Sequence, residues 1–279
     1  MQVVRTIADC RSAVRSFRQA GETLGLVPTM GFLHAGHMQL VAAAKARADR
    51  VAVTIFVNPT QFGEASDLDA YPRDEERDLA MLREAGVDLV LIPEVIDVYP
   101  AGDETIVETT RMANILHGEV RPGHFRGVTT VVARLFNFVQ PDFAAFGEKD
   151  YQQLQIIKRM TRDLAFPIEI LEVPIVREDD GLAMSSRNVR LGPEDRKAAL
   201  VLSRSLNAAE ALSDKSVETL RDTISDIINA EPRATLRGLD IVEAETLAEI
   251  SGPLTSPAAI MLSAEFGGVL LLDQRVIKA

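Results

Sequence analysis

The fold of this chain is decided by Pro28-Thr29-Met30-Gly31-Phe32-Leu33-His34-Ala35-Gly36-His37-Met38-Gln39-Leu40, where a short apolar run meets two histidines and then a long alanine-rich segment. The preceding residues, Leu24 to Val27, have the length and composition of a buried strand. After the histidines, apolar residues recur at helical spacing as far as Asp49. The stretch therefore predicts a junction at which a buried strand leads into a helix.

The junction has the features of a phosphate site. The start of a helix leaves backbone N–H groups unpaired and carries partial positive charge, so it attracts anions. Gly31 and Gly36 would let a ligand approach the backbone closely. His34 and His37 are three residues apart and should project to the same side of the first helical turn. We interpret the stretch as a nucleotide site.

Two other interpretations of the histidine pair compete with this one. The spacing would allow zinc ligation, but no cysteine cluster or HExxH pattern completes a zinc site. The histidines could also be ordinary residues at a helix end, because a four-residue HxGH match arises easily by chance. What favours the nucleotide site is the set of motifs that accompanies it.

These motifs together resemble the pantothenate synthetase family, which belongs to the HxGH nucleotidyltransferase superfamily and shares that motif with class I aminoacyl-tRNA synthetases. The resemblance covers most of residues 20 to 190 and is looser over the last third. After the junction, the other motifs follow in the family's order: Phe56-Val57-Asn58-Pro59-Thr60-Gln61-Phe62, Arg121-Pro122-Gly123-His124-Phe125-Arg126-Gly127-Val128, Phe146-Gly147-Glu148-Lys149-Asp150-Tyr151-Gln152-Gln153 and Met184-Ser185-Ser186-Arg187-Asn188.

The resemblance implies an enzyme that condenses (R)-pantoate with β-alanine. ATP would be consumed, giving (R)-pantothenate, AMP and diphosphate through an enzyme-bound pantoyl adenylate. Mg²⁺ is expected to bridge the phosphates of ATP, and no residue is directly assigned to the metal. The family's catalytic residues correspond here to His34, His37 and Lys149, with His37 in the proton-donor role.

The resemblance also implies which residues contact ATP. One group is the junction, a second is the turn after a predicted strand, and a third is a polar loop analogous to the KMSKS loop of the synthetases. Two hydroxyls and a guanidinium in that loop could bind a triphosphate as the loop closes. The full set is Met30, Gly31, Phe32, Leu33, His34, Ala35, Gly36, His37, Gly147, Glu148, Lys149, Asp150, Val176, Met184, Ser185, Ser186 and Arg187.

Other residues are expected to contact the two acid substrates, pantoate and β-alanine. Side-chain amides both donate and accept hydrogen bonds, which suits a small acid that bears hydroxyl groups. The resemblance implies that pantoate is contacted by Gln61, Gln153, Asn58, Met30 and Phe56, and β-alanine by Gln61. His117 and His124 have no partner obvious from the sequence, and we expect both to be structural.

Two rival classes of protein share parts of this pattern. A nucleotidyltransferase that acts on a phosphorylated acceptor would share HxGH but should lack the block with Asn58 and Gln61, and Gln153 as well. A non-catalytic nucleotide-binding protein would share the fold but could lose His37 or Lys149, and both are present. The whole set of motifs therefore favours the ligase.

Composition limits the partners. The chain has 279 residues, 47% of them hydrophobic, and a formal net charge of −11, which argues against sequence-independent nucleic-acid binding. No stretch approaches the roughly 20 apolar residues of a membrane span, and charged residues near the N-terminus argue against a signal peptide. The single cysteine, Cys10, is expected to be structural. We expect a cytoplasmic homodimer that binds small molecules, without nucleic-acid or membrane partners.

Strand and helix patterns alternate about four times before residue 147, which is typical of a parallel α/β sheet. We predict a Rossmann-like nucleotide- and pantoate-binding domain over residues 1–175. Its expected strands are 24–27, 51–57, 88–92, 105–109 and 143–147. Its expected helices are 3–20, 40–49, 71–86, 112–117 and 128–139, with a loop over 118–127.

Residues 176–279 follow a different pattern. Two helices are expected over 193–212 and 217–229. Strands are expected near 238–243, 259–265 and 269–272, after a flexible turn over 230–237. This pattern predicts a smaller α+β domain, which we expect to act as a lid.

Overall fold

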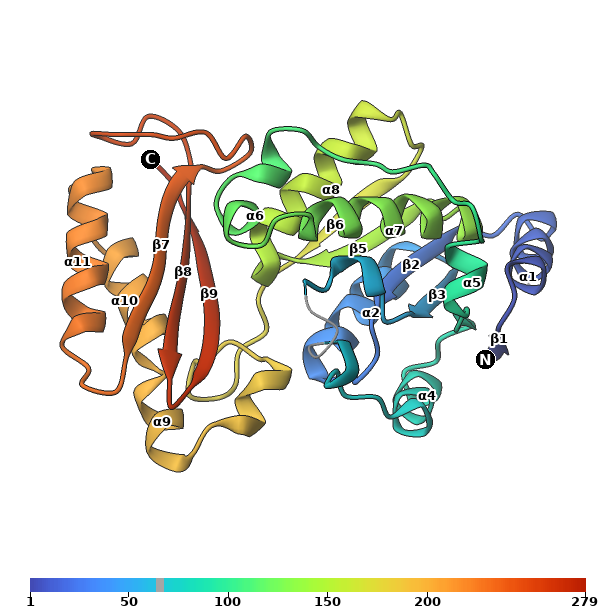
Figure 1. The fold of residues 1–279 in the computed structure, drawn as a ribbon, viewed down its shortest axis with the longest axis horizontal. Helices are drawn as coiled ribbons and strands as arrows, with labels where there is room; N and C mark the ends of the chain where they lie inside the picture. Colours follow the sequence, from blue (N-terminus) through green and yellow to red (C-terminus); the bar gives the residue numbers. More distant parts are fainter. Residues whose placement is uncertain (64–67) are drawn as a thin grey trace. The chain divides into compact units, whose positions relative to one another are not determined.

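The computed structural model describes residues 1–63 and 68–279 of the chain (Figure 1). These residues form two compact units, Met1–Val173 and Pro174–Ala279. Each unit has a hydrophobic core of its own.

The first unit is built on a sheet of six parallel strands. Their order across the sheet is β1-β4-β3-β2-β5-β6, so the direction of winding reverses between β2 and β5. Ligands of open α/β sheets bind beside the carboxyl ends of the strands at such a reversal. The predicted parallel α/β sheet is confirmed. The strands are β1 (Gln2–Val4), β2 (Leu24–Thr29), β3 (Arg50–Ile55), β4 (Leu89–Leu91), β5 (Phe143–Gly147) and β6 (Glu169–Val173).

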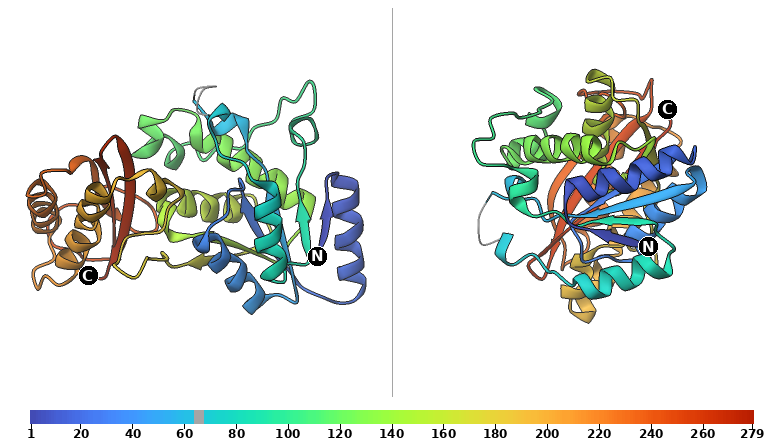
Figure 2. Two further views of the ribbon diagram at one scale, coloured as in Figure 1. Left: turned by 90° about the horizontal axis from the view of Figure 1, so that it is seen from below. Right: turned by 90° about the vertical axis from the view of Figure 1, so that its right-hand side faces the viewer.

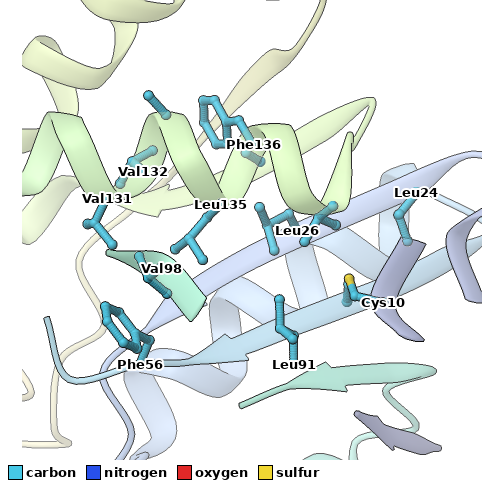
Figure 3. Packing of buried hydrophobic residues seen from close by; sticks show 14 of the residues in the cluster. Cys10, Leu24, Leu26, Phe56, Leu91, Val98, Val131, Val132, Leu135 and Phe136 are labelled. Atoms are coloured by element: carbon cyan, nitrogen blue, oxygen red, sulfur yellow. The ribbon is translucent and has the colours of Figure 1, made fainter. Parts of the chain in front are cut away.

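Helices cover both faces of this sheet (Figure 2, right). The helices on one face are α1 (Ile7–Gln19), α7 (His124–Val139) and α8 (Tyr151–Asp163), and those on the other are α2 (Ala35–Arg47) and α4 (Glu75–Glu84). Side chains along a strand alternate between the two faces. Leu24 and Leu26 of β2 therefore join the core under α7, whereas Val27 packs under α2 (Figure 3).

The first unit also contains short helical elements, which are η1 (Pro59–Gln61), α5 (Val95–Val98), η2 (Met112–Asn114), α6 (His117–Val120) and η3 (Glu148–Asp150). Two of them, η1 and η3, carry residues of the predicted site. Both η1 and η3 lie beyond carboxyl ends of strands, η1 after β3 and η3 directly after β5. Buried Phe56 lies between β3 and η1 and points into the core near Val98 (Figure 3).

Some elements of the first unit differ from the sequence prediction. The chain begins with β1, and the helix predicted over 3–20 starts only at Ile7, where Thr6 caps it. The strand predicted over 105–109 is absent, because the backbone of Val107 bonds to Thr129 and Thr130 of α7 instead of to a strand. The loop predicted over 118–127 contains most of α6 and the first turn of α7.

The second unit packs helices against an antiparallel sheet of three strands, β7-β8-β9. The strands are β7 (Thr235–Glu243), β8 (Ala258–Phe266) and β9 (Val269–Ile277). The helical elements are η4 (Ser186–Arg190), α9 (Pro193–Ala198), α10 (Val201–Glu210) and α11 (Val217–Asn229). The predicted small α+β architecture is confirmed. The single helix predicted over 193–212 is wrong, since the chain forms α9 and α10, and the turn predicted over 230–237 ends where β7 begins.

Candidate active site

The loop between β2 and α2 has an unusual backbone. Gly31 has a φ of 80° and Phe32 a φ of 50°, so two consecutive residues lie in the left-handed region. That region costs a residue with a side chain about 1 kcal/mol or more, so something must hold Phe32 there. A Cβ added at Gly31 would stand 3.1 Å from the Asp78 carboxylate and from Ile55, which explains the glycine.

Asp78 holds this loop in place. It lies in the first turn of α4 and is only 1% exposed. One carboxylate oxygen accepts a hydrogen bond from the backbone N–H of Phe32 and the other from that of Leu33, both at 2.7 Å. A buried carboxylate is tolerated when its oxygens receive such bonds. Asp78 is therefore the residue that fixes the path of the chain into α2.

The two histidines begin α2 and face one another. His34 is the N-cap, and its Nδ1 accepts from the N–H of Gly36 at 3.1 Å. His37 Nδ1 accepts from the N–H of His34 at 3.3 Å, and the ring centroids are 4.1 Å apart. In a neutral imidazole, a nitrogen that accepts leaves the proton on the other nitrogen. Both rings therefore present Nε2–H as a donor. The closeness of the two rings agrees with the prediction that the side chains project to the same side of the first helical turn.

The surroundings keep both histidines neutral. Burial and then the neighbouring His34 lower the pKa of His37 from 6.5 to about 3. Burial lowers the pKa of His34 too, and the positive charges of Lys149 and Arg77 lower it further. Hence at neutral pH the two rings act as hydrogen-bond donors rather than as cations.

Lys149 brings positive charge to the same place from β5. It lies in η3, directly after the strand, and its ammonium is 3.8 Å from the carboxylate of Asp150. The positive charge of Lys149 lowers the pKa of both His34 and His37, after the larger effect of burial. Since β2 and β5 are neighbours in the sheet, the motifs that follow them meet at its carboxyl edge.

The residues expected to contact pantoate form a second group. Gln61 ends η1, where its Nε2 lies 3.2 Å from the sulfur of Met30 and its Oε1 accepts from Asn58 at 3.1 Å. Gln153 is partly buried in the first turn of α8, and among the described residues its side chain has no hydrogen-bond partner. Its neighbour Gln152 is 3% exposed and bonds to the backbone of η2 and Ile115. Gln152 thus has a structural role, whereas the side chain of the adjacent Gln153 is available to bind a ligand.

Asn58 is placed differently from Gln61. It is 1% exposed, and both ends of its amide already bond to the protein. Its contact with pantoate, which the resemblance implies, therefore needs a different interpretation, as a residue that positions Gln61. His124, expected to be structural, also reaches this group, since its Nδ1 is 2.9 Å from the carbonyl oxygen of Gln61.

The predicted ATP loop lies in the second unit. Ser186 and Arg187 are exposed at the start of η4, whereas Met184, Ser185 and Val176 are partly buried. The base of the loop is anchored, because the N–H of Met184 donates to the carbonyl of Val176 at 2.9 Å. The loop thus presents its exposed side chains from a held base.

Asn188 and Arg196 hold the other side of that base. The amide of Asn188 donates to Glu178 at 2.8 Å and to the carbonyl of Ala183 at 3.1 Å. Arg196 forms ion pairs with Glu178 and Asp180. Asn188 belongs to the motif but was given no role from the sequence, and Glu178 and Arg196 lie outside the motif.

Some positioning residues could have been found from the sequence. Asp78 stands four residues before buried Leu82, and so lies on the apolar stripe of its helix, where a carboxylate is out of place. The sequence prediction attached no function to that charged helix. Tyr99, whose hydroxyl donates to Asn58 at 2.8 Å, carries no such signal, because its contact joins residues 41 positions apart.

Comparisons with known proteins show a similarity that extends over the whole chain. The family described as Pantoate-beta-alanine ligase matches residues 2–276. The pantothenate synthetase of Bartonella tribocorum is 50% identical over 281 aligned residues, which cover 100% of this chain and 98% of that protein. That of Agrobacterium fabrum is 49% identical, with 99% of this chain and 96% of the relative covered.

Solved structures agree with these relatives. The pantothenate synthetase from Thermus thermophilus has a TM-score of 0.91 and 46% identity, with 99% of each chain covered. A pantoate-beta-alanine ligase from Francisella tularensis, complexed with beta-gamma ATP and beta-alanine, has a TM-score of 0.80 and 33% identity. That comparison covers 99% of this chain and 97% of the other. The similarity therefore includes both units.

Proposed function

The chain belongs to the pantoate-beta-alanine ligase family, and from that premise we infer that it joins pantoate to β-alanine with ATP and that the carboxyl edge between β2 and β5 is its catalytic centre. The observation that carries this assignment is the meeting of two neutral histidines with Lys149 at that edge. An acyl-activating enzyme needs donors and positive charge around the α-phosphate, and this edge supplies both.

The first step would transfer the adenylyl group of ATP to pantoate. The carboxylate of pantoate attacks the α-phosphorus, the bond to the bridging oxygen breaks, and pyrophosphate leaves. Negative charge grows on the phosphate oxygens, so fixed donors accelerate the step. His34 and His37 would each direct Nε2–H at those oxygens, and Lys149 would add a positive charge. A triphosphate beside His37 would raise its pKa and so favour the protonated form, which is the form that can donate a proton.

The second step would consume the adenylate. The amine of β-alanine, after losing its extra proton, attacks the carbonyl carbon of the pantoyl adenylate, and AMP leaves with the oxygen that linked them. We assign Gln61 to both acids and Gln153 to pantoate, because Gln61 ends η1 after β3 and Gln153 lies in the first turn of α8 after β5. Met30 and Phe56 would supply apolar contacts to the same acid.

Mg²⁺ fits this site only with help from the substrate. Among residues 1–63 and 68–279, no group of three histidine, cysteine, aspartate or glutamate side chains could hold a metal. Mg²⁺ commonly uses one or two carboxylates together with substrate phosphates and water. We propose that ATP supplies most of its ligands, that Asp150 is one candidate carboxylate, and that the ion neutralises charge on the phosphates.

Assembly and location remain proposals. We propose a homodimer, for which sedimentation should give twice the chain mass of 30.5 kDa. In the described part of the chain, no helix has both the length and the apolar character needed to cross a membrane. We also propose that the enzyme works in the cytoplasm, which fractionation of cells would test.

Isotope exchange tests the adenylate route. Adenylation splits ATP between the α and β phosphates, whereas an acyl-phosphate route releases ADP. We expect AMP and pyrophosphate, together with pantoate-dependent exchange of labelled pyrophosphate into ATP in the absence of β-alanine. Lys149→Met, which removes the charge but keeps the side-chain length, should suppress this exchange. Release of ADP, or exchange that waits for β-alanine, would refute the route.

A further inference from the structure

A chain of hydrogen bonds runs from the core of the first unit to Gln61. Tyr99 follows α5, and its hydroxyl donates to Oδ1 of Asn58 at 2.8 Å. Nδ2 of Asn58 donates to Oε1 of Gln61 at 3.1 Å. The phenol thus reaches, through one buried amide, the residue proposed to contact pantoate and β-alanine.

The Asn58 amide has only one satisfactory orientation. Its oxygen faces three donors, namely the hydroxyl of Tyr99 and the N–H and hydroxyl of Thr60. Its nitrogen faces two acceptors, the carbonyl oxygen of Gly127 at 3.2 Å and Oε1 of Gln61. If the amide were turned over, its NH₂ group would face the three donors. Its oxygen would face the oxygens of Gly127 and Gln61. In a side chain that is 1% exposed, no water could relieve those contacts.

The orientation of Asn58 in turn orients Gln61. Because the amide nitrogen of Asn58 donates, the group of Gln61 that faces it must be the oxygen. The NH₂ group of Gln61 is therefore directed away from Asn58, where its only partner among the described residues is the weak acceptor sulfur of Met30, at 3.2 Å. A donor held in this way suits the carboxylate or hydroxyl oxygens of an acid substrate.

Tyr99 is itself held from the other side. The guanidinium of Arg134 lies 4.6 Å from the centre of its ring, and the same guanidinium donates to the carbonyl of Val98 and to Asp103. Burial raises the pKa of the Tyr99 hydroxyl, so it remains a donor at neutral pH. The start of the chain of bonds is thus fixed by α7, which carries Arg134.

We propose that Tyr99 is a positioning residue for the acid substrates: through Asn58 it sets the amide of Gln61 with its NH₂ group as the donor to pantoate. This inference rests on the proposed role of Gln61. It predicts that removing one hydroxyl that touches no substrate weakens pantoate use and leaves ATP use unchanged.

The test is a double-mutant cycle with Tyr99→Phe and Gln61→Ala, read as KM and kcat for each substrate. Tyr99→Phe keeps the ring beneath Arg134 and should raise the KM for pantoate about threefold to tenfold, the effect of one neutral hydrogen bond. The KM for ATP should not change. In the Gln61→Ala background, Tyr99→Phe should add almost nothing, since the group that it orients is gone.

A matched control removes another buried hydroxyl. Thr161 lies in α8, and its buried Oγ1 has no hydrogen-bond partner among the residues that the structure describes, so Thr161→Val should leave every KM unchanged. Denaturant unfolding of each variant separates misfolding from loss of positioning.

The other possible outcomes distinguish failure of the role of Gln61 from failure of the role of Tyr99. If Gln61→Ala leaves the KM for pantoate unchanged, the proposed role of Gln61 fails, and the inference fails with it. If Gln61→Ala raises that KM while Tyr99→Phe does not, Gln61 keeps its role and only the inference about Tyr99 fails. If the two effects are independent, or if Tyr99→Phe changes the KM for ATP equally, Tyr99 does not act through Gln61.

Discussion

At the scale of single residues, the active edge depends on groups whose protonation is set by their surroundings. His37 is neutral at neutral pH because its ring is half-buried beside His34, and its Nδ1 accepts from a backbone N–H. Asp78 is buried, and each of its two carboxyl oxygens accepts a hydrogen bond from a backbone N–H. The same loop thus joins a histidine kept neutral to an acidic side chain held by two backbone hydrogen bonds.

The half-buried His37 should make the fold sensitive to acid. Its pKa is about 3 in the folded protein and 6.5 as an ordinary histidine. Between these values the unfolded chain binds a proton that the folded protein does not, so this contribution to stability is complete above pH 6.5 and is lost as the pH falls toward 3. His37→Gln, which cannot titrate there, should lose less stability on acidification.

Urea unfolding at a series of pH values measures this effect. In a plot of the unfolding free energy against pH, the slope for His37→Gln should be smaller than that for the wild type. The difference should correspond to at most about one proton taken up on unfolding. Cys10→Ala, elsewhere in the core, is a control that should retain the wild-type slope. Parallel curves for wild type and His37→Gln would show that His37 is not buried as a neutral base.

Asp78 should be required for the nucleotide loop. In Asp78→Asn, the new NH₂ group would face a backbone N–H, so one of the bonds to Phe32 and Leu33 is lost. An unsatisfied buried pair costs about 1–3 kcal/mol. We expect a lower unfolding free energy and a higher KM for ATP, both measurable on the purified variant.

Asp74 provides the matched control for Asp78. It is the N-cap of the same helix and accepts from the N–H of Arg77. Asparagine caps a helix about as well as aspartate, so Asp74→Asn should change neither quantity. Equal behaviour of the two variants would mean that Asp78 acts only through the charge of α4.

These residues also mark how far the sequence predicts the site. The motif at the junction predicted that His34 and His37 lie at a helix start on one side, and they do. The sequence marks Asp78 as an unusual carboxylate on an apolar stripe, but it does not predict what Asp78 or Tyr99 contacts, because their partners are 46 and 41 residues away. A contact of that kind depends on how the helices pack on the sheet, which local pattern does not determine.

At the scale of elements, the close approach of α7 to η1 places Gln61. Gly127 lies within α7, and a Cβ built there would be 2.6 Å from the carbonyl oxygen of Thr60 and 2.9 Å from the Cα of Gln61. A helix interior ordinarily disfavours glycine by about 1 kcal/mol relative to alanine. A glycine is therefore needed at this position, because a side chain would enter the space that the backbone of η1 occupies.

Gly127→Ala should displace η1. The added methyl would improve helix propensity, but it meets backbone atoms that cannot move without shifting the turn. The clash should exceed the gain, so we expect a lower unfolding free energy and a higher KM for pantoate. Asn137→Ala, on the exposed side of the same helix, raises helix propensity and removes only a bond to the carbonyl of Ala133, so it should not raise that KM. An unchanged KM in Gly127→Ala would show that η1 does not depend on this contact.

Element predictions succeeded where the signal was local. The range predicted for β5 matches the strand, and that for α11 matches the helix, because apolar periodicity determined both. The strand predicted over 105–109 failed, since the backbone of Val107 bonds to threonine hydroxyls of α7 rather than to a neighbouring strand. Propensity could not distinguish these two partners.

At the scale of the whole molecule, the predicted contacts to ATP come from both units. The junction and Lys149 belong to the first unit, whereas Ser185, Ser186 and Arg187 belong to the second. Each unit has its own core, so a change at an exposed loop of one should not unfold the other. Function and stability can therefore be tested separately at this loop.

Arg187→Ala provides that test. The side chain of Arg187 is exposed at the start of η4, and in the described part of the chain it has no hydrogen-bond or ion-pair partner. An exposed substitution of this kind changes stability by about 0.5 kcal/mol or less, so the unfolding midpoint should not move. If the guanidinium binds the triphosphate, its removal should raise the KM for ATP about tenfold or more, the effect of a charge-assisted bond.

Arg190→Ala is the matched control, because Arg190 is exposed in the same short helix and its loss changes the net charge equally. With a formal charge of −11, removing any cation makes the protein more repulsive to ATP, and that general effect weakens as salt screens it. A specific contact should instead persist at high salt and affect only Arg187→Ala. If the two variants raise the KM for ATP equally, and salt abolishes both effects, Arg187 acts on ATP only as one positive charge among many.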